Sequence, residues 1–361
     1  MRLLEVYLEN FRNIERERIA LRDGVNIFYG YNAQGKTNII ESIWLFSSLK
    51  SFRGAKDSDF VKKGENNARI SCVFEKGGRE ISSEIRFFPE KRKEIYKNGI
   101  KIKTAEMMGQ VNTVLFYPEH LSLIKSGPEG RRRFVDTAIC QVKPQFYQVL
   151  NEYAKVLTQR NFLLRSERED MLETLDAWDK KLARLGAVVT HTRKTYVEKL
   201  FSFAKKTVDD ISGGKEKISE VYSSFGGKDI SSVEKEEKTL YEKLKDSIDE
   251  DIRLKFTSEG SHRDDFTVYI NGETAKIYGS QGQQRSIVMA LKLAEADICN
   301  EYNEEYPVML FDDVFSELDH MRKAYITERI KDKQVIVTTC EKIDFFENAG
   351  YFNVSGGKVI N

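Results

Sequence analysis

The chain has 361 residues, and its 58 lysines and arginines nearly balance its 57 aspartates and glutamates. A formal net charge of +1 excludes a global attraction to nucleic acid, so any phosphate-binding surface must come from local clustering. No apolar run approaches the roughly 20 residues that a membrane-spanning helix needs, and residues 1–6 show no signal-peptide pattern.

The cysteines point to a reducing compartment. They stand singly in the sequence and form no C-x-x-C pair, so we expect neither a zinc site nor a disulfide framework. We therefore expect a cytoplasmic protein. The four are Cys72, Cys140, Cys299 and Cys340.

The N-terminal segment predicts a strand, a glycine loop and a helix. Residues 3–9 and about 16–29 read as two strands, and residues 38–45 have helical spacing. The loop between them matches the phosphate-loop pattern G-x-x-x-x-G-K-[ST] in the structural context that this motif requires. Its candidate nucleotide-binding residues are Gly30, Tyr31, Asn32, Ala33, Gln34, Gly35, Lys36 and Thr37, followed by Asn38.

Each residue type in this loop suits phosphate chemistry. Gly30 and Gly35 let backbone N–H groups curl around phosphate oxygens without a Cβ in the way. Lys36 supplies a positive charge for the β- and γ-phosphates, and Thr37 offers a hydroxyl to Mg²⁺. The N-terminal end of the following helix adds further positive potential. The alternative is a chance match in a glycine turn.

Residues 68–103 predict an antiparallel meander with turns at Gly77-Gly78 and Asn98-Gly99, and residues 111–117 predict a buried strand. Basic residues cluster in the last hairpin and again where the next region starts. Such clusters can bind DNA phosphates. A solvated sheet edge and internal salt bridges are equally compatible with them. The candidate DNA contacts are Lys91, Arg92, Lys93, Arg131 and Arg132.

From residue 129 to about 208 the periodicity is helical, with few glycines and no strand signal. A short strand at 218–222 and a charged helix at 232–250 follow. We therefore predict an α/β protein with an inserted, mainly helical arm lobe. Its domains are expected at 1–127 (first part of the head), 128–255 (arm) and 256–361 (second part of the head).

The C-terminal part carries two further motifs. An apolar strand at 308–311 leads into Asp312 and Asp313, of which Asp312 can hold Mg²⁺ and Asp313 can orient or deprotonate a water. Before it, a helix at about 281–302 opens with a serine cap and a glycine, which makes a second anion site. The alternatives are that Asp312 and Asp313 only cap the end of the strand and that the serine is an ordinary helix cap. The candidate residues of the second motif are Ser280, Gln281, Gly282 and Gln283.

The order of these motifs is similar to that of the ABC-type ATPase heads of the SMC and Rad50 group. Within that group the chain resembles the RecF family over its whole length, and the inserted region is too short for a long coiled coil. The matching segments are residues 8–13, 38–43, 116–121, 127–134, 262–265 and 280–285.

The resemblance implies a DNA-binding ATPase that requires ATP and Mg²⁺ and dimerises when ATP is bound. It implies that Ser280 and its neighbours reach the γ-phosphate held by Lys36 of a second copy. Asp319 would line the dimer seam, and Arg12 would lie near the nucleotide phosphates. Members of the family bind single- and double-stranded DNA near their junctions, and help RecO and RecR place RecA on gapped DNA during repair.

Two departures from ABC transporter heads are visible. Their switch histidine is replaced by Thr338-Thr339-Cys340, so we expect slow hydrolysis, and the turn Pro118-Glu119-His120 occupies about the place of their Q-loop glutamine. A transporter ATPase subunit, another SMC-like complex and a non-enzymatic DNA-binding module remain the alternatives. The stretch His262-Arg263-Asp264-Asp265 suggests either a metal site or a hydrogen-bonded turn.

Overall fold

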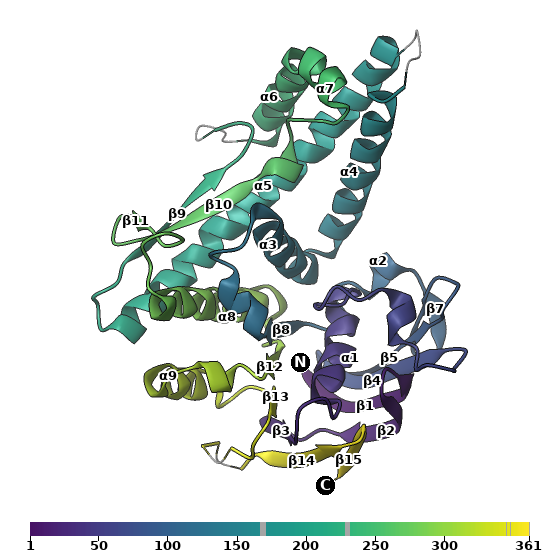
Figure 1. The fold of residues 1–361 in the computed structure, drawn as a ribbon, viewed down its shortest axis with the longest axis vertical. Coiled ribbons are helices and arrows are strands. Elements are labelled where there is room, and N and C mark those ends of the chain that lie inside the picture. The colour runs from purple at the N-terminus through teal and green to yellow at the C-terminus, as the bar shows by residue number, and fades with distance from the viewer. Residues whose placement is uncertain (167–170, 228–231, 344, 347, 361) are drawn as a thin grey trace. The chain divides into compact units, whose positions relative to one another are not determined.

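A computed structural model describes residues 1–166, 171–227, 232–343, 345–346 and 348–360 (Figure 1). The chain divides into two compact units. The first contains Met1–Ser122, Asp210–Gly213 and Val288–Asn361, and the second contains Leu123–Asp209 and Gly214–Ile287. No helix among the described residues is long and apolar enough to cross a membrane.

A six-stranded sheet, in the order β15-β14-β3-β13-β12-β8, forms the centre of the first unit. All neighbouring strands run parallel except β15, which is antiparallel to β14. The strands are β3 (Val25–Tyr29), β8 (Thr113–Phe116), β12 (Val308–Asp312), β13 (Val335–Thr339), β14 (Gly350–Ser355) and β15 (Lys358–Ile360).

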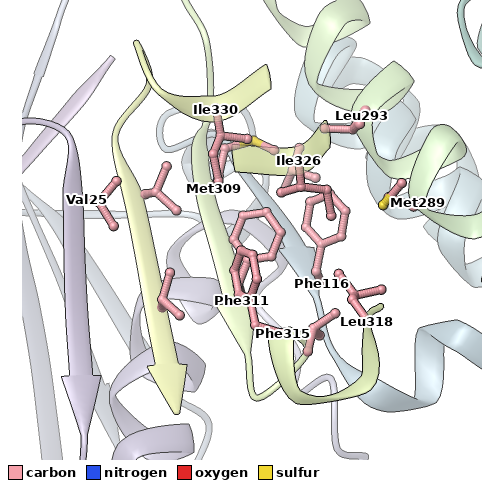
Figure 2. Close-up of a cluster of buried hydrophobic side chains, with 14 of the residues drawn as sticks. Val25, Phe116, Met289, Leu293, Met309, Phe311, Phe315, Leu318, Ile326 and Ile330 are labelled. Atoms are coloured by element: carbon pink, nitrogen blue, oxygen red, sulfur yellow. The ribbon is translucent and has the colours of Figure 1, made fainter. Parts of the chain in front are cut away.

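Helices cover both faces of this sheet, which explains why every residue of β12 and β13 is buried. Helix α1 (Lys36–Ser48) packs against one face, and α9 (His320–Ile330) and the later turns of α8 (Gln281–Asn303) lie on the other (Figure 1). Figure 2 shows the apolar core between the strands and these last two helices, where Phe116 and Phe311 stack with their centroids 4.3 Å apart.

The second sheet of this unit is antiparallel, in the order β2-β1-β4-β5-β6-β7. It confirms the predicted meander, which a short helix, α2 (Thr104–Met107), follows. The strands are β1 (Arg2–Phe11), β2 (Ile14–Ala20), β4 (Ala68–Lys76), β5 (Arg79–Phe87), β6 (Glu94–Lys97) and β7 (Ile100–Ile102).

The single strand predicted at 16–29 is wrong, because β2 and β3 belong to different sheets. The chain turns between them at Gly24, whose φ of 75° lies in the left-handed region. Buried Asn26 fixes this turn by accepting from the Arg22 N–H at 2.8 Å and donating to the Arg22 carbonyl at 2.9 Å. The hydrophobic pattern continues through the turn, so the sequence gives no sign that one strand ends and another begins there.

The second unit is mainly helical, as predicted. A three-stranded sheet in the order β11-β10-β9 accompanies the helices. Its strands are β9 (Ile218–Ser223), β10 (Asp265–Ile270) and β11 (Glu273–Thr274). Its helices are α3 (Pro128–Val142), α4 (Pro144–Leu163), α5 (Met171–Ser212), α6 (Val233–Asp246) and α7 (Ile248–Leu254), with the first turns of α8.

The two units do not coincide with the predicted division at 1–127, 128–255 and 256–361, which stays a prediction about domains. The difference is largest at the second boundary. Strand β10 was expected to belong to the head, but it pairs with β9 inside the second unit, so this unit continues to Ile287. Short strands carry no sequence signal for their pairing partner, so this assignment needed the structure.

Arg160 of α4 is a fully buried cation at the centre of the second unit. Its Nε lies 2.5 Å from Asp179 of α5, and its Nη1 lies 2.6 Å from Asp251 of α7. Nη1 also donates to the Thr257 hydroxyl at 3.0 Å. One guanidinium thus holds two buried carboxylates and links three helices.

Glu236 of α6 is a buried carboxylate that lacks such compensation. Neither of its oxygens accepts a hydrogen bond within the described part of the chain, and His191 Nδ1 of α5 lies 3.5 Å from Oε1. Burial raises the pKa of Glu236 from 4.5 to about 7. Helix α6 is therefore held by the apolar contacts of Leu240 and Leu244 and weakened by an acid that ionises near neutral pH.

We expect Arg160→Met to lower the free energy of unfolding by about 3–5 kcal/mol, because it leaves two carboxylates buried without a counter-charge. Urea denaturation measures the change. The matched control is Arg133→Met on α3, whose ion pair with Glu129 is exposed (68% and 80%). The control should cost less than about 1 kcal/mol, and equal losses would contradict this account of Arg160.

We expect Glu236→Gln to stabilise the protein more at pH 8 than at pH 5. The unfolded carboxyl ionises near pH 4.5 and the folded one near pH 7, so this residue weakens the fold as the pH rises between these values. The gain at pH 8 should be about 1–3 kcal/mol after allowance for relaxation. Thermal unfolding at both pH values measures it, with exposed Glu242→Gln on the same helix as the control. A gain independent of pH would rule out ionisation as its cause.

Candidate functional site

The glycine loop between β3 and α1 has the geometry of an anion cradle. Gly30 has a φ of 150°, and a Cβ there would meet the Val354 carbonyl oxygen at 2.3 Å. Gly35 has a φ of 114° and is the N-cap of α1, without a side-chain cap. The first N–H groups of a helix have no partner within the helix. Their donors are therefore open to a ligand at this helix start.

Lys36 lies along the loop and is only 7% exposed. Its Nζ donates to the carbonyl oxygens of Gly30 at 2.5 Å and Tyr31 at 2.8 Å. The ammonium group is thus held at the loop that carries the open N–H groups, where a phosphate chain would need a positive charge.

Strand pairing brings the acidic pair to this loop. In the parallel register, Thr338 of β13 lies opposite Asp312 of β12, and Thr339 lies opposite Tyr29 of β3. Asp312 Oδ1 accepts hydrogen bonds from the Thr37 hydroxyl at 3.0 Å and the Thr338 hydroxyl at 2.7 Å. Two residues that were predicted to bind metal, Thr37 and Asp312, are therefore in direct contact.

These oxygens suit Mg²⁺. Burial raises the pKa of Asp312, and the hydrogen bonds from Thr338 and Thr37 oppose this rise. A desolvated carboxylate beside a hydroxyl is a favourable place for a hard divalent cation, which commonly takes few protein ligands and completes its shell with phosphate and water. Thr37 and Asp312 are thus the residues that fit this ion.

Asp313 lies beside Asp312 in a strained backbone conformation, with a φ of 52°. Its N–H donates to the Thr338 carbonyl and hydroxyl oxygens, both at 3.2 Å. Burial raises the pKa of its carboxyl group, and the charge of Lys36 lowers it. The side chain is half-buried, which leaves part of it open to solvent.

Three contributions to this site escaped the sequence analysis. Thr338 binds Asp312, and Gln34 is braced by the β14–β15 turn, whose Gly356 N–H donates to its Oε1 at 2.6 Å. Arg53 Nη1 donates to Asn38 Oδ1 at 3.5 Å, and its charge helps to lower the pKa of Asp312. No spacing rule relates Thr338, Gly356 and Arg53 to the phosphate loop and the acidic pair, because the fold alone brings them together.

Arg12 contacts α1 rather than the loop itself. Its Nη2 forms an ion pair with buried Glu41 of α1 at 2.7 Å, and its guanidinium lies 5.1 Å from the centroid of the Phe60 ring. The following residue reaches the helix start, since Asn38 Nδ2 donates to Asn13 Oδ1 at 2.7 Å. A phosphate contact by Arg12 stays a prediction.

Ser280 starts α8 with a reciprocal cap. Its Oγ accepts from the Gln283 N–H at 3.2 Å, while Gln283 Oε1 accepts from the Ser280 N–H at 2.8 Å. Ser280 and Gln281 are exposed, whereas Gly282 and Gln283 are partly buried. All four belong to the second unit, while the phosphate loop and the acidic pair belong to the first.

The structure changes the interpretation of the basic clusters. Arg131 is buried, and its Nε and Nη2 bind the Asp265 carboxylate at 2.6 and 2.8 Å. Arg132 donates to the Asp264 carbonyl at 2.7 Å, and Lys93 Nζ donates to the Leu49 carbonyl at 2.5 Å. Arg131 is thus held in an internal ion pair, and a DNA contact for it stays a prediction, whereas Lys91 and Arg92 remain exposed.

The His262-Arg263-Asp264-Asp265 stretch forms a hydrogen-bonded turn. His262 Nδ1 and the Tyr153 hydroxyl lie 2.9 Å apart, and Asp264 Oδ2 accepts from Thr190 at 2.7 Å and from Tyr222 at 2.9 Å. Among the residues that the structure describes, no group of three His, Cys, Asp or Glu side chains could hold a metal ion. The turn joins α4, α5 and β9 through these hydrogen bonds.

Comparisons with known proteins agree with this geometry. Residues 2–355 match the family model of the RecF/RecN/SMC N-terminal domain. A DNA replication and repair protein RecF of Ruminiclostridium cellulolyticum is 40% identical over 98% of this chain and 97% of its own length. The RecF protein of a Thermoanaerobacter species is also 40% identical, over 100% and 99%.

Solved structures give the same result. A structure of the recombination mediator protein RecF with ATP, in the RecFOR pathway, superposes with a TM-score of 0.93 at 35% identity. The superposition covers 99% of this chain and 97% of that one. The Smc head domain of Pyrococcus furiosus matches with a TM-score of 0.57 at 16% identity, which shows a shared fold.

Proposed function

Because this chain belongs to the RecF family of DNA replication and repair proteins, we propose that it is an ATP-dependent, DNA-binding recombination mediator. The transporter alternative is not favoured, since relatives that match the full length are DNA replication and repair proteins. The observation that carries the ATPase assignment is the contact of Thr37 with Asp312 beside the glycine loop.

The site supports hydrolysis of ATP to ADP and phosphate. The open N–H groups at the start of α1 and the Lys36 ammonium bind the β- and γ-phosphates. Thr37 and Asp312 would hold Mg²⁺, which would supply charge neutralisation for the transferred phosphoryl group. Asp313 orients the attacking water and accepts its proton. With no histidine in the segment Thr338-Thr339-Cys340, we propose slow, DNA-stimulated turnover that suits a switch.

The second half of each ATP site comes from another copy of the chain in this proposal. The exposed cap Ser280 offers a helix start to a γ-phosphate, and a single loop with Lys36 already cradles the phosphates of its own subunit. ATP would thereby join two copies, with Ser280, Gln281, Gly282 and Gln283 completing the partner's site and Asp319 at the seam.

We further propose that the ATP-bound dimer binds single- and double-stranded DNA near their junctions and acts with RecO and RecR to load RecA at gaps. A solved relative is a recombination mediator protein of the RecFOR pathway, which supports this assignment. A DNA substrate also favours the cytoplasm as the location. The exposed cations Lys91 and Arg92 are the proposed phosphate contacts on the β5–β6 hairpin, with Arg132 and Lys93 less accessible.

We expect Lys36→Met and Ser280→Arg to abolish ATP turnover separately and to restore it when mixed. A mixed dimer holds one intact site, formed by the loop of one chain and Ser280 of the other. Since half of randomly paired dimers are mixed, turnover should recover to about a quarter of the wild-type value. Steady-state phosphate release measures the recovery.

The matched control for this complementation is a mixture of Lys36→Met with Asp312→Asn. Both residues lie on the same unit, so a mixed dimer holds no intact site and turnover should stay absent. Fluorescence energy transfer between labelled chains verifies that mixed dimers form. If they form and Lys36→Met with Ser280→Arg regains nothing, Ser280 does not act across the dimer.

We expect the double substitution Lys91→Glu and Arg92→Glu to weaken duplex DNA binding and to reduce its dependence on salt. Each lost phosphate contact should lower the slope of log affinity against log salt by about 1. Fluorescence anisotropy over a salt series measures both effects. The charge-matched control is Lys238→Glu with Lys331→Glu, two cations that are 79% and 56% exposed. Equal effects of the two pairs would assign the change to net charge alone.

A further inference from the structure

Cys340 occupies a place that the proposed mechanism does not use. It directly follows β13, at the edge of the sheet where the phosphate loop and the acidic pair meet. Its Sγ lies 2.9 Å from Asn32 Oδ1 of the loop and 3.8 Å from Asp313 Oδ2. This thiol therefore lies between the phosphate loop and the carboxylate assigned to the water.

The thiol can act only as the donor in these contacts. Asn32 Oδ1 and the Asp313 carboxylate oxygens are acceptors, and a thiol has one proton to give. Burial, with the negative charge of Asp313, raises the pKa of the Cys340 thiol. The group therefore keeps its proton at neutral pH, as a donor requires.

Residues at the end of β13 contact both Asp312 and Asp313. Thr338 donates to Asp312 at 2.7 Å, and Cys340, two residues later, is directed to Asp313. The backbone of Asp313 is constrained, since its N–H is bound to Thr338 and its φ of 52° lies in the left-handed region. What remains to be fixed is the direction of its carboxylate, and Cys340 approaches both carboxylate oxygens, at 3.8 and 3.9 Å.

We propose that Cys340 is a positioning residue for ATP hydrolysis: its one S–H proton, shared between Asn32 Oδ1 and the Asp313 carboxylate, orients that carboxylate relative to the phosphate loop. The inference rests on the proposed ATPase function and deepens it. A thiol shared between Asn32 and Asp313 makes the orientation of the carboxylate depend on the loop. Loss of the donor should therefore impair the reaction step and leave ATP binding intact.

The test compares Cys340→Ala with Cys340→Ser. Alanine removes the donor and should lower kcat by about ten- to a hundredfold, because a displaced catalytic group costs rate steeply. Serine restores a donor of similar size and should keep kcat within about threefold of wild type. The dissociation constant of ATP should change less than about twofold in both. A serine variant as slow as the alanine variant would overturn the proposal.

A double-substitution cycle separates positioning from a structural effect. Where Asp313 is already Asn, adding Cys340→Ala should cause little further loss of kcat, because the two residues act as one unit. A full additional loss in the Asp313→Asn background would show that Cys340 does not act through Asp313. Turnover of the wild-type protein and of Lys36→Met is measured in parallel. If the wild-type protein does not hydrolyse ATP, or if Lys36→Met hydrolyses it equally fast, the ATPase assignment itself fails, and this failure is distinguished from a failure of the role of Cys340.

Thiol labelling provides a readout that does not depend on turnover. Cys72, Cys140 and Cys299 are buried and Cys340 is partly exposed, so N-ethylmaleimide should label Cys340 first in the folded wild-type protein. ATP with Mg²⁺ should slow this labelling at least several-fold, as peptide mass analysis measures, whereas ATP should give no protection in Lys36→Met. Labelling of Cys340 at the same rate with and without ATP would place the thiol outside the nucleotide site and overturn the proposal.

Discussion

The parallel alignment of β3, β13 and β12 is the constraint on which the candidate site depends. Parallel strands end at the same edge of a sheet, so the segments that follow them converge whatever their distance in sequence. The glycine loop follows β3, Asp312 ends β12 with Asp313 directly after it, and Thr338 lies at the end of β13 with Cys340 directly after the strand. Buried Gln334 fixes this alignment against the antiparallel sheet, since it accepts from the Leu3 N–H at 2.6 Å and donates to the Leu3 carbonyl at 2.7 Å.

The second unit is organised by buried arginines rather than by apolar packing alone. Arg160 holds Asp179 and Asp251, and Arg131 holds Asp265. Arg193 of α5 binds Asp136 through two nitrogens, at 2.7 and 2.8 Å. A planar guanidinium makes two directed contacts at once, so each pair fixes the angle between elements as well as their distance. These buried arginines therefore have internal ion-pair partners, which account for their presence without a ligand.

Motifs with fixed local geometry were predictable, and contacts between distant segments were not. Lys36, Thr37 and Asp312 could be assigned because a glycine loop between strand and helix, and an acid at a strand end, each imply a chemistry at short range. The partner of Arg131, Asp265, could not be predicted because it is distant in sequence, and a basic triplet looks the same whether it binds DNA or a partly buried carboxylate. The strand break at Gly24 was missed because the hydrophobic pattern continues through the turn. The pairing of β10 with β9 could not be predicted because short strands carry no sequence signal for their partner. Roles for Ser280 and Arg12 toward a nucleotide stay predictions.

The position of β3 has a consequence for the order in which the protein folds. This strand comes early in the chain, yet its neighbours on both sides, β13 and β14, come from residues 335–355. During synthesis it has no partner until almost the whole chain has been made, whereas the second unit can assemble from residues 123–287 beforehand. The turn after β14 also braces the loop, through the Gly356 and Gly357 N–H groups bound to Gln34. The nucleotide site, which includes Thr338 of β13 and the turn between β14 and β15, can therefore be completed only after these C-terminal segments have been made.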